Sequence, residues 1–342
     1  MEPRDRVVGQ LEHRETDFVP YVIPIGEQVG ERLDRHYGGR QWRQAKCDHI
    51  AAVDVAKLFD FENPRDGLAR DAFGSLWRTD REPAHLVEPA LPEPDLSDYE
   101  FPDPDDVFRD NWLEEGRAEC ERLASEGRFA IAVLGYCLFE RSWTLRGYEN
   151  ALMDMVARPD FYGELLERIM EFNLQVLSRY LQLPIDGIQT GDDWGTQRGL
   201  VMGKRRWMEL FLPLYAQIWG RVKEAGLYAM HHSCGNISQI VGEAAGVGLD
   251  CFESVQPEAM EPYGLKRRFG DRIAFWGGVG TQHLLPHGSP EAIRSEVARL
   301  CREMSRGGGY ILAPAKPVMP DVPTENAAAF LEAVLEQAGC KL

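Results

Sequence analysis

The segments DGIQTGDD (residues 186–193) and LYAMHHSCGN (residues 227–236) decide the fold of this chain. Each begins with a short run of apolar and β-forming residues and then turns to glycine and polar side chains, which is typical of a buried strand followed by a loop. The stretch between them, residues 204–225, has the periodicity of a helix. The sequence therefore predicts a strand–helix–strand unit with parallel strands.

The same alternation recurs along all 342 residues. Eight strand-like runs are present, at residues 19–25, 49–55, 129–135, 186–191, 227–232, 249–255, 273–278 and 310–313. Helical patterns lie between most of them, at residues 159–181, 204–225, 237–245, 290–306 and 323–337. Eight such repeats predict an α/β fold, namely a (β/α)8 TIM barrel that forms a single domain over residues 1–342.

Residues 61–108 interrupt the pattern. This segment is acidic and carries prolines at positions 64, 83, 89, 92, 94, 102 and 104. Within it, DAFGSLW (residues 71–77) predicts a short β-hairpin. We interpret the segment as an insertion after the second strand, of the kind that shapes the mouth of a barrel.

Composition narrows the class of partner. The chain has 38 basic and 55 acidic residues and a formal net charge of −17, which disfavours nucleic acids and anionic membranes. Its longest apolar stretch, residues 129–139, is far shorter than the roughly 20 residues of a membrane span. The N-terminus lacks the layout of a secretory signal, and the seven cysteines are scattered, so we expect a cytoplasmic protein without a disulfide framework. The expected partner is a small molecule or another protein.

The catalytic residues of a (β/α)8 barrel lie at the carboxyl ends of its strands. Nine polar or aromatic side chains end or follow the predicted strands. They are Glu27, Glu140, Asp192, Asp193, Trp194, His232, Gln256, Trp276 and Lys316. Among these we assign Asp192, Glu140 and Lys316 as candidate catalytic residues, and Trp194, Gln256, Trp276 and Glu27 as candidate substrate-binding residues.

His232 and Cys234 are the sharpest signal. Residues two apart on a strand project to the same side, about 6.6 Å apart along it, so both could coordinate one metal ion. Imidazole and thiolate are zinc ligands, and Gly235 allows the backbone to turn away behind them. The alternative is a buried histidine and a small apolar cysteine that line the top of the barrel. The parity of Cys234 selects His232 over His231, provided that the strand is regular.

Two further groups have equally open readings. Because side chains alternate along a strand, one of Asp192 and Asp193 points into the barrel. The inward carboxylate would be a metal ligand, a general base or a partner for Lys316. The alternative is that the pair consists of a helix-capping acid and a solvent-facing neighbour. Lys316 lies between Pro314 and Pro317, which stiffen its backbone and fix the direction of its ammonium. The ammonium would then bind an anionic group of a substrate or cofactor, or it forms an ordinary salt bridge. The ring of Trp276 offers a planar surface to a ligand, or packs in the core.

The chain resembles the uroporphyrinogen decarboxylase superfamily over nearly its whole length. The residues that carry the resemblance are PRDR (3–6), DFVP (17–20), YEN (148–150), GDDWGTQ (191–197), HSCG (232–235), FGDR (269–272), GG (277–278) and DVPTEN (321–326). The resemblance implies a (β/α)8 barrel. True uroporphyrinogen decarboxylases have an arginine-bearing segment after the first strand that meets the substrate carboxylates. This chain has IGEQVGER (25–32) there, and its acids would repel a polycarboxylate.

The resemblance is closer to the cobamide-dependent methyltransferase branch. There, a His-x-Cys pair and a later cysteine hold zinc, and His232 and Cys234 match the first two positions. The third position falls at Ala315-Lys316, so Cys251, Glu253, Glu140 or Asp192 would have to complete the site. The resemblance implies zinc as cofactor and a corrinoid carried by a partner protein.

Three functions remain open at this point. The leading one is transfer of a methyl group between a small molecule (a methyl ether, methylamine or thiol) and a corrinoid, assisted by zinc. The second is metal-independent decarboxylation or lysis of a small carboxylic acid, with Lys316 and Arg198 or Arg205 holding the anion. The third is a noncatalytic ligand-binding barrel.

Overall fold

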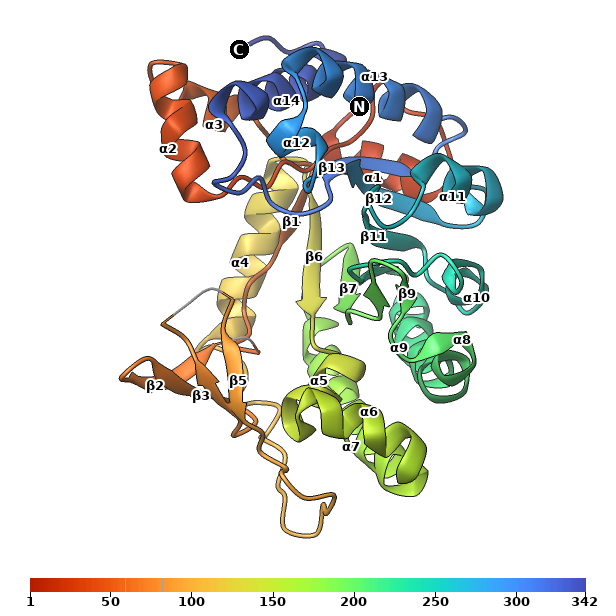
Figure 1. Ribbon diagram of the computed structural model, residues 1–342. Coiled ribbons are helices and arrows are strands. Elements are labelled where there is room, and N and C mark those ends of the chain that lie inside the picture. Colours follow the sequence, from red (N-terminus) through yellow and green to blue (C-terminus); the bar gives the residue numbers. More distant parts are fainter. Residues whose placement is uncertain (59, 81–82) are drawn as a thin grey trace.

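The computed structural model describes residues 1–58, 60–80 and 83–342. A curled parallel sheet of seven strands lies at its centre (Figure 1). In spatial order the strands are β1 (Ile50–Ala52), β6 (Phe129–Leu134), β7 (Gly187–Gly191), β10 (Tyr228–His232), β11 (Cys251–Val255), β12 (Ala274–Val279) and β13 (Tyr310–Pro314). Each coincides with a predicted run, so the predicted parallel α/β barrel is confirmed.

The eighth predicted run, residues 19–25, lies between β13 and β1. The Leu312 amide donates to the Pro20 carbonyl (2.9 Å), the Val22 amide donates to the Leu312 carbonyl (3.0 Å), and the His49 amide donates to the Tyr21 carbonyl (3.0 Å). Proline has no amide hydrogen, so Pro20 and Pro24 break what would otherwise be a continuous ladder. The run therefore joins the two ends of the sheet through isolated contacts rather than as a regular strand.

Helices pack around the outside of this sheet. They are α1 (Pro3–Leu11), α2 (Glu27–His36), α3 (Gln41–Ala45), α4 (Trp112–Ser125), α5 (Phe139–Arg146), α6 (Tyr148–Ala157), α7 (Pro159–Tyr180), α8 (Gly203–Arg206), the π-helical turn η1 (Trp207–Phe211), α9 (Leu212–Glu224), α10 (Val241–Gly246), α11 (Pro262–Phe269), α12 (Leu284–His287), α13 (Pro290–Met304) and α14 (Thr324–Gln337). The five predicted helical stretches are confirmed to within a few residues. Ser289 begins α13 by accepting a hydrogen bond from the Ala292 amide, and Pro290 is its first residue.

Between β1 and β6 the chain forms a separate antiparallel sheet, orange in Figure 1. Its strands are β2 (Phe61–Arg65), β3 (Leu68–Asp71), β4 (Leu76–Arg78) and β5 (His85–Glu88). The turn from β3 to β4 confirms the predicted hairpin, because Asp71 Oδ1 accepts the amides of Phe73 and Ser75. A second small pair, β8 (Gly195–Thr196) and β9 (Gly199–Leu200), follows β7. That residues 61–108 are an insertion into one domain stays a prediction.

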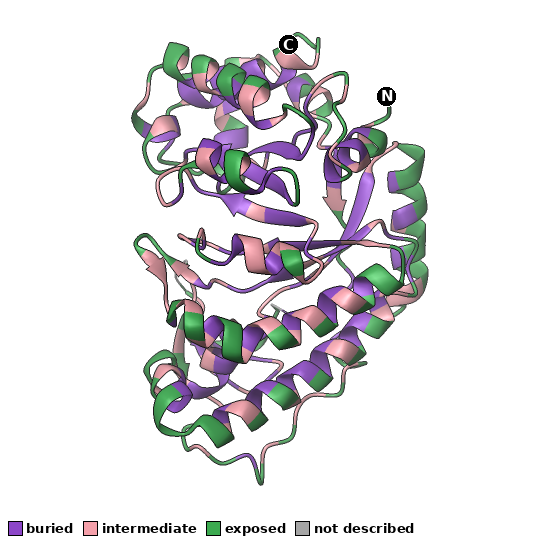
Figure 2. Ribbon diagram, turned by 90° about the vertical axis from the view of Figure 1, so that its right-hand side faces the viewer, coloured by how far each residue is buried: buried purple, intermediate pink, exposed green. Residues whose placement is uncertain are grey.

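Two apolar layers hold the barrel together. The larger lies between the sheet and the helices, whose inner faces are buried and outer faces exposed (Figure 2). The smaller fills the barrel itself and includes Phe129, Met230, Cys251 and Ile311. Val7 and Leu11 of α1 belong to this inner cluster, so α1 closes the barrel at the amino ends of its strands.

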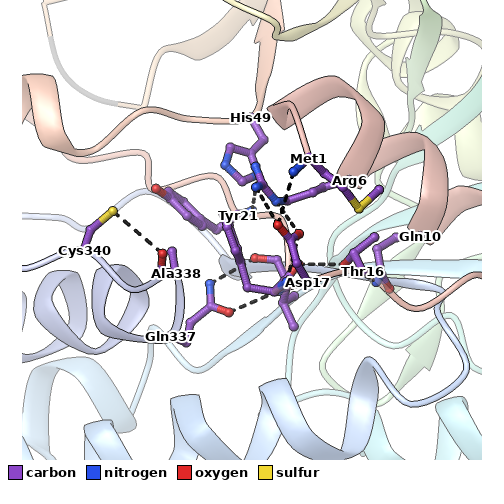
Figure 3. A network of polar contacts seen from close by, with 12 residues as sticks. Met1, Arg6, Gln10, Thr16, Asp17, Tyr21, His49, Gln337, Ala338 and Cys340 are labelled. Carbon is purple, nitrogen blue, oxygen red and sulfur yellow. Dashed lines mark hydrogen bonds and ion pairs between the residues drawn. The ribbon is translucent and has the colours of Figure 1, made fainter.

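A polar network ties down this closed end (Figure 3). Arg6 donates to both carboxylate oxygens of Asp17 at 2.7 and 2.8 Å and lies over the ring of Phe18, and these hydrogen bonds hold the pKa of Asp17 below its usual range. Gln10 accepts the amide of Tyr310, the first residue of β13. The motifs at residues 3–6 and 17–20 thus serve the stability end of the barrel and not its mouth.

In the part of the chain that the structure describes, no helix is long and apolar enough to cross a membrane. The seven cysteines, all among the described residues, form no disulfide.

Candidate functional site

Strand parity builds the inner wall of the barrel mouth. Met230 pairs with Cys251 and His232 pairs with Glu253 in the register of β10 and β11, while Trp276 is the partner of Glu253 on β12. Met230 and Cys251 lie in the inner core cluster, so the residues two positions on, His232 and Glu253, form the next layer toward the carboxyl ends. His232, Glu253 and Trp276 line a cavity of about 180 Å³ there.

Three potential ligands converge beside this cavity. Cys234 Sγ lies 3.4 Å and Asp193 Oδ1 lies 3.5 Å from Nε2 of His232. One ligand atom from each of the three residues falls within 4.8 Å of the others. Donors bound at roughly 2.0–2.3 Å to a tetrahedral zinc are themselves about 3.3–3.8 Å apart. Imidazole, thiolate and carboxylate are all zinc donors, so these residues fit the ion and leave a fourth position for water or substrate.

Glu253 fixes the imidazole. Its Oε2 contacts Nδ1 of His232 and also accepts a hydrogen bond from Gln189 Nε2 (3.2 Å). Burial alone lowers the pKa of His232, but Glu253, Asp193 and Cys234 outweigh it and hold that pKa well above its usual range. With Nδ1 facing Glu253, Nε2 is the nitrogen presented to Asp193 and Cys234. A carboxylate in this place selects the tautomer and ring orientation that a metal-binding histidine needs.

Asp193 is the inward carboxylate, and its Oδ1 accepts the amide of Cys234 (2.8 Å). Burial raises the pKa of Asp193, but hydrogen bonding and charge from His232 and hydrogen bonds from Cys234 outweigh it and bring that pKa to about 2. Asp193 is therefore ionised, which is the form that binds a cation.

Asp192, the residue assigned from the sequence, faces the other way. It is fully buried, and it accepts the amides of Leu138, Phe139 and Glu140 at 2.8–2.9 Å together with the hydroxyl of Tyr215 at 2.7 Å. These donors oppose the rise that burial causes in the pKa of Asp192. The capping alternative describes this geometry, except that Asp192 caps α5, which precedes it in the chain.

Glu140 stands in the first turn of α5. Burial, with repulsion from Asp192 and Asp193, raises the pKa of Glu140 to about 9. Its carboxyl group is thus protonated at neutral pH, and it feels the charge of His232. A neutral carboxyl group here can donate a proton.

Lys316 reaches the same place from the loop after β13 and lines the cavity with His232 and Glu253. Partial burial lowers the pKa of Lys316, but Cys234, Asp193 and Glu253 outweigh it, so that its pKa is raised and the ammonium persists.

The other candidates are placed differently. Trp194 is fully buried and stacks on His231 with ring centroids 3.9 Å apart, away from the cavity. Gln256 is buried and its Oε1 accepts the amide of Gly235, so it holds the turn behind Cys234. Glu27 is exposed on α2 and pairs with Arg43. Of the four proposed substrate-binding residues, Trp276 lines the cavity.

The candidates for a third metal ligand lie in different places. Cys251 lies one layer below His232, among the inner core residues, and Glu253 is directed to the opposite imidazole nitrogen. Among the described residues, the converging group contains Asp193 and neither Cys251, Glu140 nor Asp192. Arg198 and Arg205, the anion-binding candidates of the lyase hypothesis, are exposed, and neither lines the cavity.

Comparison with known families decides the relationship. Residues 133–337 match the family model described as "Uroporphyrinogen decarboxylase (URO-D)". The chain belongs to the uroporphyrinogen decarboxylase family. A uroporphyrinogen decarboxylase from Pseudoalteromonas translucida is 41% identical over 71 residues, which cover 21% of this chain and 20% of that protein. One from Neisseria meningitidis serogroup C is 28% identical over 236 residues, or 63% of this chain and 61% of that protein. The chain thus spans between about a fifth and three fifths of the curated relatives it matches.

Solved structures agree on the fold. A methyltransferase from Methanosarcina mazei superposes with a TM-score of 0.73, covering 98% of this chain and 99% of that one at 16% identity. At this identity the likeness establishes a shared fold along almost the whole chain, as predicted from the strand pattern.

Proposed function

We propose that the protein is a zinc-assisted methyltransferase that moves a methyl group between a small molecule (a methyl ether, methylamine or thiol) and a corrinoid on a partner protein. The observation that carries the proposal is the convergence of Asp193, His232 and Cys234 at the carboxyl end of the barrel. The likeness of the fold to a methyltransferase supports it.

His232, Cys234 and Asp193 would hold the metal. When bound, zinc polarises the heteroatom that carries the methyl group and makes that heteroatom a better leaving group. Glu253 keeps the imidazole oriented. Glu140 carries a proton near neutral pH in the metal-free fold, and we assign it as the group that would protonate the heteroatom when a reduced corrinoid takes the methyl group. The mostly apolar wall of the cavity would contact the methyl group and the rest of the small molecule.

The geometry disfavours decarboxylation of uroporphyrinogen. The cavity of about 180 Å³ is smaller than the roughly 300–1,000 Å³ of pockets that hold drug-sized ligands, whereas uroporphyrinogen is a tetrapyrrole. Among the described residues of its lining, Lys316 is the one lysine or arginine, so a molecule with many carboxylates lacks counter-charges once His232 holds a metal.

Metal analysis of the purified protein tests the proposal. The wild type should contain about one zinc per chain, Cys234→Ser should contain little, and Cys340→Ser, an exposed cysteine outside the cavity, should match the wild type. The wild type should also demethylate methylcobalamin in the presence of a suitable thiol acceptor, and the visible spectrum reports this reaction. A wild type purified without chelators that holds no zinc would contradict the proposal and favour the metal-independent lyase.

A further inference from the structure

Lys316 is held by the backbone on both sides. The Ala315 amide donates to the Val279 carbonyl (2.9 Å), and the Ala315 carbonyl accepts the Ser254 hydroxyl (2.7 Å). On the other side, the Val318 amide donates to the Pro24 carbonyl (2.9 Å). Three segments of the barrel rim therefore fix the loop that carries Lys316, and Pro317 stiffens it further.

The ammonium of Lys316 forms no ion pair with a described carboxylate of the protein. Among the described residues, no carboxylate lies within 4.0 Å of its Nζ, and its principal electrostatic partner is Cys234. Cys234 and Asp193 are the residues that would hold the metal. Once their negative charges are directed to a cation, the ammonium beside them lacks an equivalent partner.

The described residues of the cavity wall give it three kinds of surface. Val22, Pro24, Trp276, Pro314 and Pro317 give it apolar sides. His232 and Glu253 lie at the metal cluster, and Lys316 is the one lysine or arginine among the described lining residues. A ligand that fills about 180 Å³ therefore meets His232 of the metal cluster, an ammonium group and an apolar wall at the same time.

We propose that the substrate is a small carboxylic acid with a methylated heteroatom, and that Lys316 binds its carboxylate while the heteroatom faces the His232–Cys234–Asp193 cluster. This inference rests on the proposed function and specifies its substrate class. Lys316 is exposed at the rim of the cavity, so a neutral methyl ether or methylamine would gain no ion pair from its ammonium. An acid instead forms a charge-assisted hydrogen bond with Lys316.

Cobalt(II) in place of zinc gives a direct readout of binding, since its visible bands change when a ligand enters the open position. The probes are methoxyacetate and 2-methoxyacetamide, which have nearly the same shape and differ in charge. We expect methoxyacetate to bind the wild-type cobalt protein about 10-fold or more tightly than the amide, as a charged hydrogen bond would give. Lys316→Gln should abolish the difference, Lys316→Arg should retain most of it, and Lys341→Gln, near the C-terminus, should behave as the wild type.

Two results separate the possible failures. Normal cobalt binding with equal affinity for acid and amide, or an unchanged preference in Lys316→Gln, would overturn the role of Lys316 and leave the metal site standing. A protein that takes up no cobalt would overturn the metal site and this inference with it. Metal content, measured on the same samples, distinguishes the two.

Discussion

Cys234 Sγ lies 3.4 Å from Nε2 of His232, on the same side of the strand end. Asp193 Oδ1 approaches the same nitrogen at 3.5 Å, while Glu253 occupies the other nitrogen of the ring. A sulfur, a carboxylate oxygen and an imidazole nitrogen thus face a common point, and the imidazole cannot turn away without losing its carboxylate partner. This arrangement is expected of a cation site with a second layer of support.

Asp193→Asn should lower zinc affinity by about 10-fold or more, because an amide is a poorer ligand than a carboxylate and adds no negative charge. Its fold should be unaffected, since the Asp193 side chain is 41% exposed. Competition with a coloured chelator measures the affinity, and circular dichroism checks the fold.

Asp192→Asn is the matched control at the neighbouring position. It should keep zinc but lose about 2 kcal/mol or more of unfolding free energy, since a buried amide cannot accept from all four donors that Asp192 accepts from. Urea denaturation measures this loss. If Asp192→Asn lost the metal and Asp193→Asn kept it, the assignment of the two carboxylates would be reversed.

Glu253→Gln should weaken zinc binding by roughly 10–100-fold without abolishing it, because the imidazole would lose the group that fixes its tautomer. Cys251→Ala, one layer below on the same strand, should leave zinc affinity unchanged. Both variants are compared in the same chelator competition. Equal losses in the two would indicate general damage to β11 and not a specific role for Glu253.

Glu140 gives the metal-free protein a pH dependence with a definite sign. Its pKa is raised to about 9 in the fold, so between its unfolded pKa of about 4.5 and about pH 9 the folded chain retains a proton that the unfolded chain releases. The contribution of Glu140 to stability is therefore fully present below pH 4.5 and is lost as the pH rises toward 9. In Glu140→Gln this loss should disappear, so the variant should gain stability relative to the wild type between pH 5 and pH 9. Parallel urea unfolding curves across this range would contradict the raised pKa.

Substitution by phenylalanine should affect stability at Trp194 and substrate binding at Trp276. Trp194→Phe loses packing against His231 and should lower the melting temperature without changing KM for the small-molecule substrate. Trp276→Phe reshapes the cavity wall and should raise KM. A KM effect confined to Trp194→Phe would restore the sequence-based assignment of that residue.

The sequence predicted the barrel because eight apolar runs with helical patterns between them have few other arrangements. His232 followed from its parity with Cys234. The inward member of Asp192 and Asp193 could not be read from the sequence, because strands of a parallel barrel are buried on both faces and β7 lacks an apolar–polar alternation that would tell inside from outside. Counting from Gln189, which contacts Glu253 inside the barrel, would have selected Asp193, but that contact is visible only in the structure.

The orientations of Trp194 and Gln256 could not be predicted for a related reason. Position after a strand places a residue at the barrel mouth but does not say whether its side chain turns toward the axis or back under the helices. Trp194 shares the outward parity of Thr190 and Asp192 and packs with Tyr215, and Gln256 is drawn to the amide of Gly235. Contacts made by residues distant in sequence decide both orientations.

X-ray absorption at the zinc edge of the wild-type protein tests the central claim most directly. The account predicts a single sulfur ligand at about 2.3 Å, from Cys234, with nitrogen and oxygen ligands at about 2.0–2.1 Å from His232, Asp193 and one exchangeable group. Two or more sulfur ligands, or a spectrum unchanged in Asp193→Asn, would contradict the assignment of Asp193 as the third ligand.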